Sequence, residues 1–342
     1  MHIVLCGQSG YEWWMNRASV SCNPGPRVSG RRNAAAGPFC TINGISSFDD
    51  TDHRVLHSAS PTTRAVSLLE GYSFLSQPYH CLVSSESDAR RDSRIKMHYC
   101  GSALGKGSFV RVADGLVVAS PEISFIQYAR TLSVIDAARR GSELCGVFSY
   151  NAAIEHGLQR VDAITSGARI ASVAQRDSCI RGSMSARRIA PHLLNGAASP
   201  PEVELALRLS LPRRYGGFGF KKPELNYVVS LNDKASRIAG RDYLVADVCW
   251  PDERIVLEYD SNSVHLDAAQ LSRDATKRDA YGIMGYESII VTATRMKSAP
   301  AMEELAERVR KVAGWRKPQY VKEGYEAMRR EFACSWVRSL KG

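Results

Sequence analysis

Residues 243–260, with the sequence YLVADVCWPDERIVLEYD, predict two β-strands joined in a hairpin. The apolar run Tyr243–Trp250 is followed by the turn-forming segment Pro251–Glu253 and by a second apolar run, Ile255–Asp260. Each run carries an acid among apolar neighbours, Asp247 in the first and Glu258 in the second. Because the strands of a hairpin lie side by side, we expect these two acids to be close together.

The two acids predict a site for a divalent metal. A buried lone carboxylate costs several kcal/mol unless a cation or hydrogen-bond donors balance its charge. Mg²⁺, or Mn²⁺ in its place, is a hard cation that takes few protein carboxylates and keeps several waters. A metal held by Asp247 and Glu258 would lower the pKa of a bound water and neutralise charge on a scissile phosphate.

Two segments before the hairpin add candidate residues. Ser199-x-x-Glu202 has the pattern of a capping box at the start of a helix, so Glu202 either serves the site or only accepts the backbone N–H of Ser199. The glycine-containing stretch 213–223 predicts a loop, and its Lys221 and Lys222 are placed to contact a phosphate backbone.

The segment after the hairpin adds a histidine and a charged helix. His265 titrates in the useful range, so it is a candidate base or phosphate contact, with a packing or surface role as the alternative. Arg273, Asp274, Lys277 and Arg278 recur at helical spacing and share a face, which either is solvated or lies near phosphate. The candidate DNA contacts are therefore Lys221, Lys222, Arg273 and Arg278.

Composition favours a polyanionic partner. The 342 residues include 45 Lys and Arg against 35 Asp and Glu, which gives a net charge of +10, and the apolar fraction of 44 % is sufficient for well-packed cores. Nucleic acid is the usual partner of such a balance, although a merely basic surface would give the same numbers. The length predicts two or three domains.

The nine cysteines predict a reducing compartment. They are scattered without any C-x-x-C pair, so neither a zinc ribbon nor a redox dithiol is indicated. The N-terminus has no signal-peptide pattern, and no apolar stretch is long enough to cross a membrane. We therefore expect a cytoplasmic protein with no membrane association.

Four regions follow from the distribution of these patterns. Residues 1–78 are poorly defined, 79–196 predict an α+β region with a helical connector, 197–314 contain the candidate site, and 315–342 form a basic tail with interleaved aromatic residues. In the second region, one helix is expected to begin at Ser120-Pro121-Glu122 and to end before Gly141. The tail either contacts nucleic acid or packs its aromatic side on the protein.

The order of the motifs resembles a known nuclease group. Ser-Pro-x-Glu202, Asp247, Val256 to Asp260, His265, Arg273-Asp274, Arg278 and Gly285 before a strand at 289–292 occur in this order. Over about residues 199–313 the chain looks like the very-short-patch-repair-related branch of the PD-(D/E)XK nuclease-like superfamily. Residues 79–196 are similar, more weakly, to the abortive-infection antitoxin or regulator-like region found upstream of it.

The resemblance implies an α/β fold: a restriction-endonuclease-like mixed sheet flanked by helices, preceded by a smaller α+β domain. It also implies Mg²⁺-dependent hydrolysis of DNA in defence or repair, with a toxin or other defence-system protein as a further partner. By matching position, Asp247 would be the central metal ligand, Glu258 the second acid, and His265 an assisting histidine. The candidate catalytic group is Glu202, Asp247, Glu258, Asp260, His265 and Lys277.

Two departures from the family pattern concern activity. Asp260 stands where the superfamily has a lysine, so His265, Lys277 or a second metal would have to supply the missing charge. Ser261 stands where many members have glycine. Two alternatives therefore stay open: an antitoxin-like DNA-binding regulator with an inactive nuclease fold, or a structural or partner-binding protein whose acids are paired internally.

Overall fold

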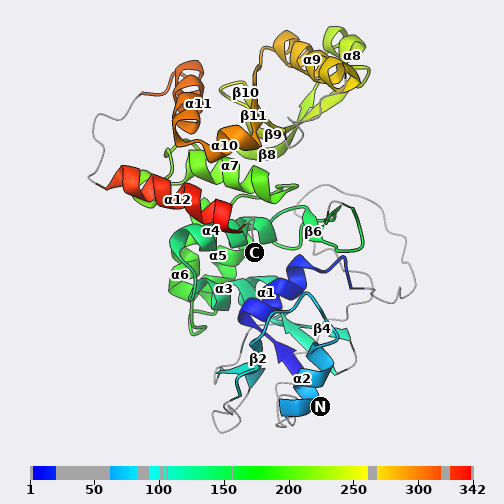
Figure 1. The fold of residues 1–342 in the computed structure, drawn as a ribbon, viewed down its shortest axis with the longest axis vertical. Helices are drawn as coiled ribbons and strands as arrows, with labels where there is room; N and C mark the ends of the chain where they lie inside the picture. Colours follow the sequence, from blue (N-terminus) through cyan, green and yellow to red (C-terminus); the bar gives the residue numbers. More distant parts are fainter. Residues whose placement is uncertain are drawn as a thin grey trace. The chain divides into compact units, whose positions relative to one another are not determined.

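A computed structural model describes residues 3–20, 62–83, 92–100, 104, 107–113, 115–155, 157–260, 268–316 and 324–339 of the chain. The chain divides into two compact units, residues 1–193 and residues 194–342 (Figure 1). The division lies three residues before residue 197, where the sequence predicts the start of the domain with the candidate site.

The first unit is built on a mixed five-stranded sheet. Its strands are β1 (Ile3–Leu5), β2 (Tyr79–Val83), β3 (Ile95–Tyr99), β4 (Phe109–Ala113) and β5 (Leu116–Ala119), in the order β3-β2-β1-β5-β4. The central strand β1 is parallel to β5 and antiparallel to β2, and β2 is parallel to β3. The predicted regions 1–78 and 79–196 therefore share one sheet, because β1 inserts between strands that lie far along the chain.

Helices cover this sheet. They are α1 (Gly7–Met15), α2 (Thr62–Leu69), α3 (Pro121–Ala129), α4 (Val134–Leu144), α5 (Gly167–Arg176), α6 (Ser183–Ile189) and the 3₁₀ helix η3 (Ala190–His192). Helix α1 contacts β2 and β5 and packs against α3. A small hairpin, β6 (Phe148–Tyr150) and β7 (Leu158–Arg160), completes the unit.

The single helix expected from Ser120 to the residue before Gly141 is two helices, and Gly141 lies inside the second. Ser120 caps α3 as predicted, since its hydroxyl accepts the N–H of Ile123. Helix α3 ends at Ala129, and α4 begins after Ser133, whose hydroxyl accepts the N–H of Asp136. The second cap interrupts the apolar periodicity because a serine before an acidic first turn favours a new helix start.

The second unit contains a mixed four-stranded sheet, β11-β10-β9-β8. Its strands are β8 (Glu224–Ser230), β9 (Tyr243–Trp250), β10 (Ile255–Asp260) and β11 (Glu287–Thr292). The strand pairs β8–β9 and β9–β10 are antiparallel, whereas β10 and β11 are parallel and are connected through a helix. The α/β class and the mixed sheet flanked by helices are confirmed.

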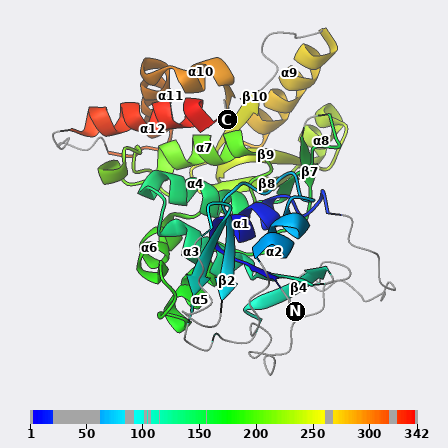
Figure 2. The ribbon, with the colours of Figure 1, turned by 60° about the horizontal axis from the view of Figure 1, so that its bottom comes forward.

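Seven helices of the second unit are found among the described residues. They are α7 (Pro200–Ser210), the 3₁₀ helix η4 (Arg213–Tyr215), α8 (Asp233–Ala239), α9 (Ala268–Ile283), α10 (Ala293–Lys297), α11 (Ala299–Val312) and α12 (Tyr325–Ser339). Helix α9 connects β10 to β11 and contacts α8 (Figure 2). Its residues Ala280 and Tyr281 are buried in one cluster with Ala246 and Val256. Gly285 has a φ of +77°, and this left-handed conformation, which glycine adopts without strain, lets the chain turn from α9 into β11.

Aromatic residues of the tail pack on the second unit. Phe332 is 1 % exposed, and the hydroxyl of Tyr325 donates a hydrogen bond of 2.9 Å to the carbonyl of Gly217. Trp315 lies against Phe220 and Trp250, with ring centroids 5.0 and 5.8 Å apart. These contacts agree with the packing alternative for the tail. None of the helices in the described ranges is both long enough and apolar enough to span a membrane.

Candidate active site

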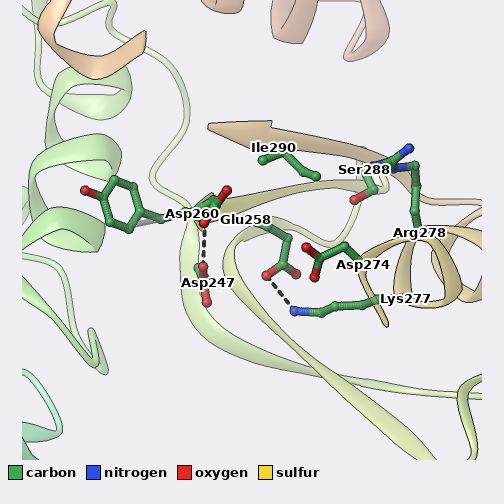
Figure 3. Close-up of a pocket in the computed structure, with 9 residues that line it drawn as sticks. Asp247, Glu258, Asp260, Asp274, Lys277, Arg278, Ser288 and Ile290 are labelled. Carbon is green, nitrogen blue, oxygen red and sulfur yellow. Dashed lines mark hydrogen bonds and ion pairs between the residues drawn. The ribbon is translucent and has the colours of Figure 1, made fainter. Parts of the chain in front are cut away.

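Asp247 and Glu258 lie beside each other on neighbouring strands. The register pairs Leu257 with Val248, so the next residues along the hairpin are Glu258 and Asp247. The backbone N–H of Tyr259 donates a hydrogen bond of 2.7 Å to Oδ2 of Asp247, which fixes this carboxylate against β10 (Figure 3). The proximity predicted from the hairpin is therefore present.

Both carboxylates line one cavity of about 270 Å³, named here the acid cavity. Helix α9 and strands β10 and β11 supply most of its wall. The lining residues are Asp247, Glu258, Tyr259, Asp260, Asp274, Lys277, Arg278, Ser288 and Ile290. Four of these nine residues are acids and two are cations, so the cavity combines negative charge with two positive side chains on the helix.

Helix α9 holds Glu258 through two side chains one turn apart. Lys277 Nζ lies 2.6 Å from Oε2 of Glu258, and the Tyr281 hydroxyl donates a hydrogen bond of 2.8 Å to Oε1. The Lys277 side chain is 33 % exposed and that of Glu258 is 15 % exposed, so water reaches this ion pair. Each Glu258 oxygen has a second lone pair for another partner.

Burial raises the pKa of both acids. Burial and then the charge of Asp247 raise the pKa of Glu258 to about 7, although Lys277 and Tyr281 act in the opposite direction. Burial also raises the pKa of Asp247, against the lowering effects of the Tyr259 N–H and of Lys277. Two neighbouring carboxylates that resist ionisation are stabilised when a cation binds between them.

Glu202 lies at the edge of this charge cluster and is fully hydrogen-bonded. Its carboxylate accepts the N–H of Ala198 at 2.8 Å, the Ser199 hydroxyl at 2.7 Å and the Asn226 side-chain amide at 2.8 Å. Burial and then the charge of Asp247 raise its pKa. The predicted capping box is corrected in detail: Glu202 accepts the N–H of Ala198 rather than that of Ser199, and the Ser199 hydroxyl turns to Glu202 instead of capping the helix.

A second cavity, of about 350 Å³, shares Asp274 and Lys277 with the acid cavity. It is also lined by Arg273 and Arg241 and by Tyr243, whose side chain is among the exposed large residues at 54 %. The predicted charged face of α9 is therefore divided: Arg278 faces the acid cavity, Arg273 faces the second cavity, and Lys277 borders both.

Two of the predicted residues, Lys221 and Lys222, do not line either of these cavities. Lys221 forms an ion pair with Glu253 and lies 5.9 Å from the centroid of the Trp315 ring. Lys222 follows it in the segment before β8, whereas the acid cavity is lined by residues of β9, β10, β11 and α9. His265 lies outside the described residues.

The donor set fits a hard cation that keeps much of its own water. Among the residues that the structure describes, no group of three or more His, Cys, Asp and Glu side chains forms a preorganised metal cluster. Asp247 and Glu258 nevertheless offer oxygen ligands in one cavity, and one or two carboxylates are the usual protein contribution to bound Mg²⁺. These two residues would hold Mg²⁺ or Mn²⁺.

Two residues of the site are not evident from motif patterns. Tyr281 is four residues after Lys277, and this helical spacing was the available signal for a second contact to Glu258. Asn226 lies between residues that pair with Val248 and Ala246, so it stands opposite Asp247 on β8. It adopts a φ of 50° and donates from its side-chain amide to both Glu202 and the carbonyl of Gly196.

No protein-family model matches the chain, and neither a curated protein nor a solved structure is significantly similar to it.

Proposed function

We propose that the second unit is a metal-dependent endonuclease that hydrolyses DNA phosphodiester bonds, in defence or repair. The observation that carries the proposal is that Asp247 and Glu258, from adjacent antiparallel strands, line one cavity together with Lys277. Paired carboxylates with a nearby lysine suit the charge changes of phosphodiester hydrolysis, because negative charge develops on the phosphate oxygens. The basic composition of the chain supports a polyanionic substrate.

Asp247 and Glu258 would hold the metal. When bound there, Mg²⁺ or Mn²⁺ would act as a Lewis acid toward the phosphate and lower the pKa of a coordinated water. The hydrogen bond from the Tyr259 N–H fixes Asp247, and the Tyr281 hydroxyl fixes Glu258, so both carboxylates are positioned before any ligand arrives.

Lys277 would supply the positive charge that, in the nuclease superfamily that the sequence resembles, comes from a lysine at the strand position of Asp260. Asp260 occupies that strand position, whereas Lys277 reaches Glu258 from α9. An ammonium group at this place stabilises the negative charge of both Glu258 and an incoming phosphate. Asp260 and Asp274 line the same cavity and would orient water or the lysine by hydrogen bonding.

The second cavity would receive the DNA chain next to the scissile phosphate. Arg241 and Arg273 offer positive charge to the backbone, and the exposed ring of Tyr243 offers a stacking surface for a base. Lys277 and Asp274 border both cavities, so a strand bound in the second would lead into the first.

One observation favours the alternative of a DNA-binding regulator without cleavage. Both oxygens of Glu258 and both oxygens of Glu202 already accept hydrogen bonds, so these acids are stabilised without a metal. Such a protein would bind DNA at low salt and leave it intact. The two functions therefore differ in a single measurable outcome.

Cleavage of supercoiled plasmid and of linear duplex DNA with Mg²⁺ or Mn²⁺ tests the proposal. We expect wild-type protein to cut, Asp247→Asn and Glu258→Gln to lose roughly 10²- to 10³-fold or more of the rate, and Asp252→Asn to retain it. Asp252 is an exposed acid of the same hairpin and matches the charge change. Binding of DNA without metal-dependent cutting by freshly purified wild-type protein would favour the regulator.

A further inference from the structure

The first unit contains a separate cavity of about 470 Å³, named here the basic cavity. It lies where the start of α1 meets β2, β3 and the end of α3, and the segment before α6 closes one side. Its polar lining includes His80, Lys96, His98, Arg130 and Arg181, and Tyr99 and Tyr128 add aromatic surface. Its volume is within the range of small-molecule sites, about 300–1,000 Å³.

Three permanent cations converge on this cavity from three separate segments. Lys96 is on β3, Arg130 follows α3, and Arg181 precedes α6. No Asp or Glu is found among the described residues that line the cavity, and none of the described carboxylates forms an ion pair with these three side chains. Like charges gathered without a counter-charge repel each other, so an anion bound between them would be stabilised.

Other arginines of the first unit are arranged differently. Arg139, Arg140, Arg169 and Arg176 each form an ion pair with a carboxylate of the same unit. Pairing with an acid is therefore common among the arginines of this unit. Lys96, Arg130 and Arg181 have no such acidic partner among the described residues and lie around one cavity, an arrangement that suits an anionic ligand.

Two histidines add hydrogen-bonding groups to the cavity wall. His80 Nδ1 and His98 Nε2 lie 3.0 Å apart, so one ring donates an N–H to the other. Burial, then His98 and then Lys96 lower the pKa of His80 to about 4, and burial and then Lys96 lower that of His98, so both shifts favour the neutral rings. Each ring has a second nitrogen, one a donor and one an acceptor, which suits a phosphate oxygen and its hydroxyl.

We propose that the basic cavity binds a phosphomonoester attached to a nucleoside, carried by a free nucleotide or by the 5′ end of a nucleic-acid strand. Lys96, Arg130 and Arg181 would surround the phosphate, with His80 and His98 as hydrogen-bonding partners. Tyr99, whose side chain is 43 % exposed at the cavity, offers a stacking face for the base. This site belongs to the first unit and does not depend on the proposed nuclease activity.

Isothermal titration of the full chain at low salt tests this site. The probes are adenosine 5′-monophosphate, adenosine, and one short DNA strand with and without a 5′-phosphate. The test variant is Arg130→Gln with Arg181→Gln, and the control is Arg160→Gln with Arg188→Gln, which removes the same charge from exposed positions of the same unit. Circular dichroism confirms that both variants are folded.

We expect the monophosphate to bind and adenosine to bind at least tenfold more weakly. The test variant should weaken phosphate binding by on the order of tenfold for each lost cation, and the control by less than twofold. A preference for the phosphorylated strand over the nucleotide would identify a nucleic-acid end as the source, and the opposite order would identify a free nucleotide. Equal binding of adenosine and its monophosphate, no binding of any phosphorylated probe, or equal loss in both variants would overturn the proposal.

Discussion

The acid cavity of the second unit and the basic cavity of the first unit are opposite in charge. Carboxylates from β9 and β10 gather in one, with Lys277 beside them, whereas Lys96, Arg130 and Arg181 surround a pair of histidines in the other. Burial and like charges act in both. They raise the pKa of Glu258 to about 7 and lower that of His80 to about 4.

This difference indicates two ligands of opposite sign. In each cavity the pKa shifts of Glu258 and His80 favour the neutral form, because ionisation would place a charge in a buried site beside charge of the same sign. A ligand of opposite charge removes this penalty. We therefore expect the acid cavity to bind a cation and the basic cavity to bind an anion, and we expect each ligand to stabilise the folded chain.

The lysine of the acid cavity provides the largest expected effect. Replacing Lys277 by methionine leaves Glu258 beside Asp247 without its cation, so the pKa of Glu258 should rise further. We expect the rate of metal-dependent DNA cleavage to fall by roughly 10²- to 10³-fold. The measurement is the initial rate of plasmid cutting at saturating metal.

Lys234→Met is the matched control, because Lys234 is an exposed lysine of α8 in the same unit. It should cut DNA at close to the wild-type rate. Unchanged cleavage by Lys277→Met would show that the lysine only pairs with Glu258, and the acid cavity would then lack the cation that the proposal requires.

The two cavities should make the stability of the folded chain change with pH in opposite directions. Glu258 has an ordinary pKa of 4.5 and a folded value of about 7, so the folded chain binds more protons between these values and loses stability as pH rises through this window. His80 has an ordinary pKa of 6.5 and a folded value of about 4, so stability is lost as pH falls from about 6.5 to about 4. Each contribution is at most roughly 3–4 kcal/mol.

Urea unfolding in EDTA between about pH 4 and pH 8 checks both signs. The difference between wild type and Glu258→Gln should fall with rising pH, and the difference between wild type and His80→Asn should rise with it. If the free energy of unfolding depends on pH in the same way in the wild type and in both variants, the pKa values of Glu258 and His80 are not shifted by folding as inferred.

A smaller effect on stability is expected from Asn226, which helps to position Glu202 by hydrogen bonding. Asn226 has a φ of 50° and bonds to Glu202 and to Gly196. Asn226→Gly removes the hydrogen bonds at a cost of about 1 kcal/mol, while Asn226→Ala adds the strain of a left-handed Cβ, about 1 kcal/mol more. Thermal unfolding should rank wild type above glycine and glycine above alanine, and an equal loss in both variants would argue against backbone strain.

The local elements of the second unit were predictable from sequence. The strands at Tyr243–Trp250 and Ile255–Asp260 have the predicted bounds, because continuous apolar runs flank a proline-containing turn. The proximity of Asp247 and Glu258 followed from the hairpin, since adjacent antiparallel strands leave little choice of partner. The α/β class with a mixed sheet flanked by helices was implied by the resemblance of the motifs to a nuclease group, and it is confirmed.

Long-range pairings and supporting contacts were not predictable. Strand β1 has only three residues, and its parallel pairing with β5 joins positions more than a hundred residues apart, which no local period reveals. Lys277 was predicted as a candidate on a charged face, but its contact with Glu258 depends on how α9 packs against the sheet. The basic cavity was missed entirely, because Lys96, Arg130 and Arg181 share no motif and are brought together by the fold.

The central claim is that Asp247 and Glu258 bind one divalent cation between them. Isothermal titration of Mn²⁺ into wild type, Asp247→Asn, Glu258→Gln and the Asp252→Asn control at about pH 8 tests it most directly. We expect one site in wild type and the control, and its loss in both variants of the acid cavity. No Mn²⁺ binding by wild type, or equal binding by all four proteins, would contradict the claim.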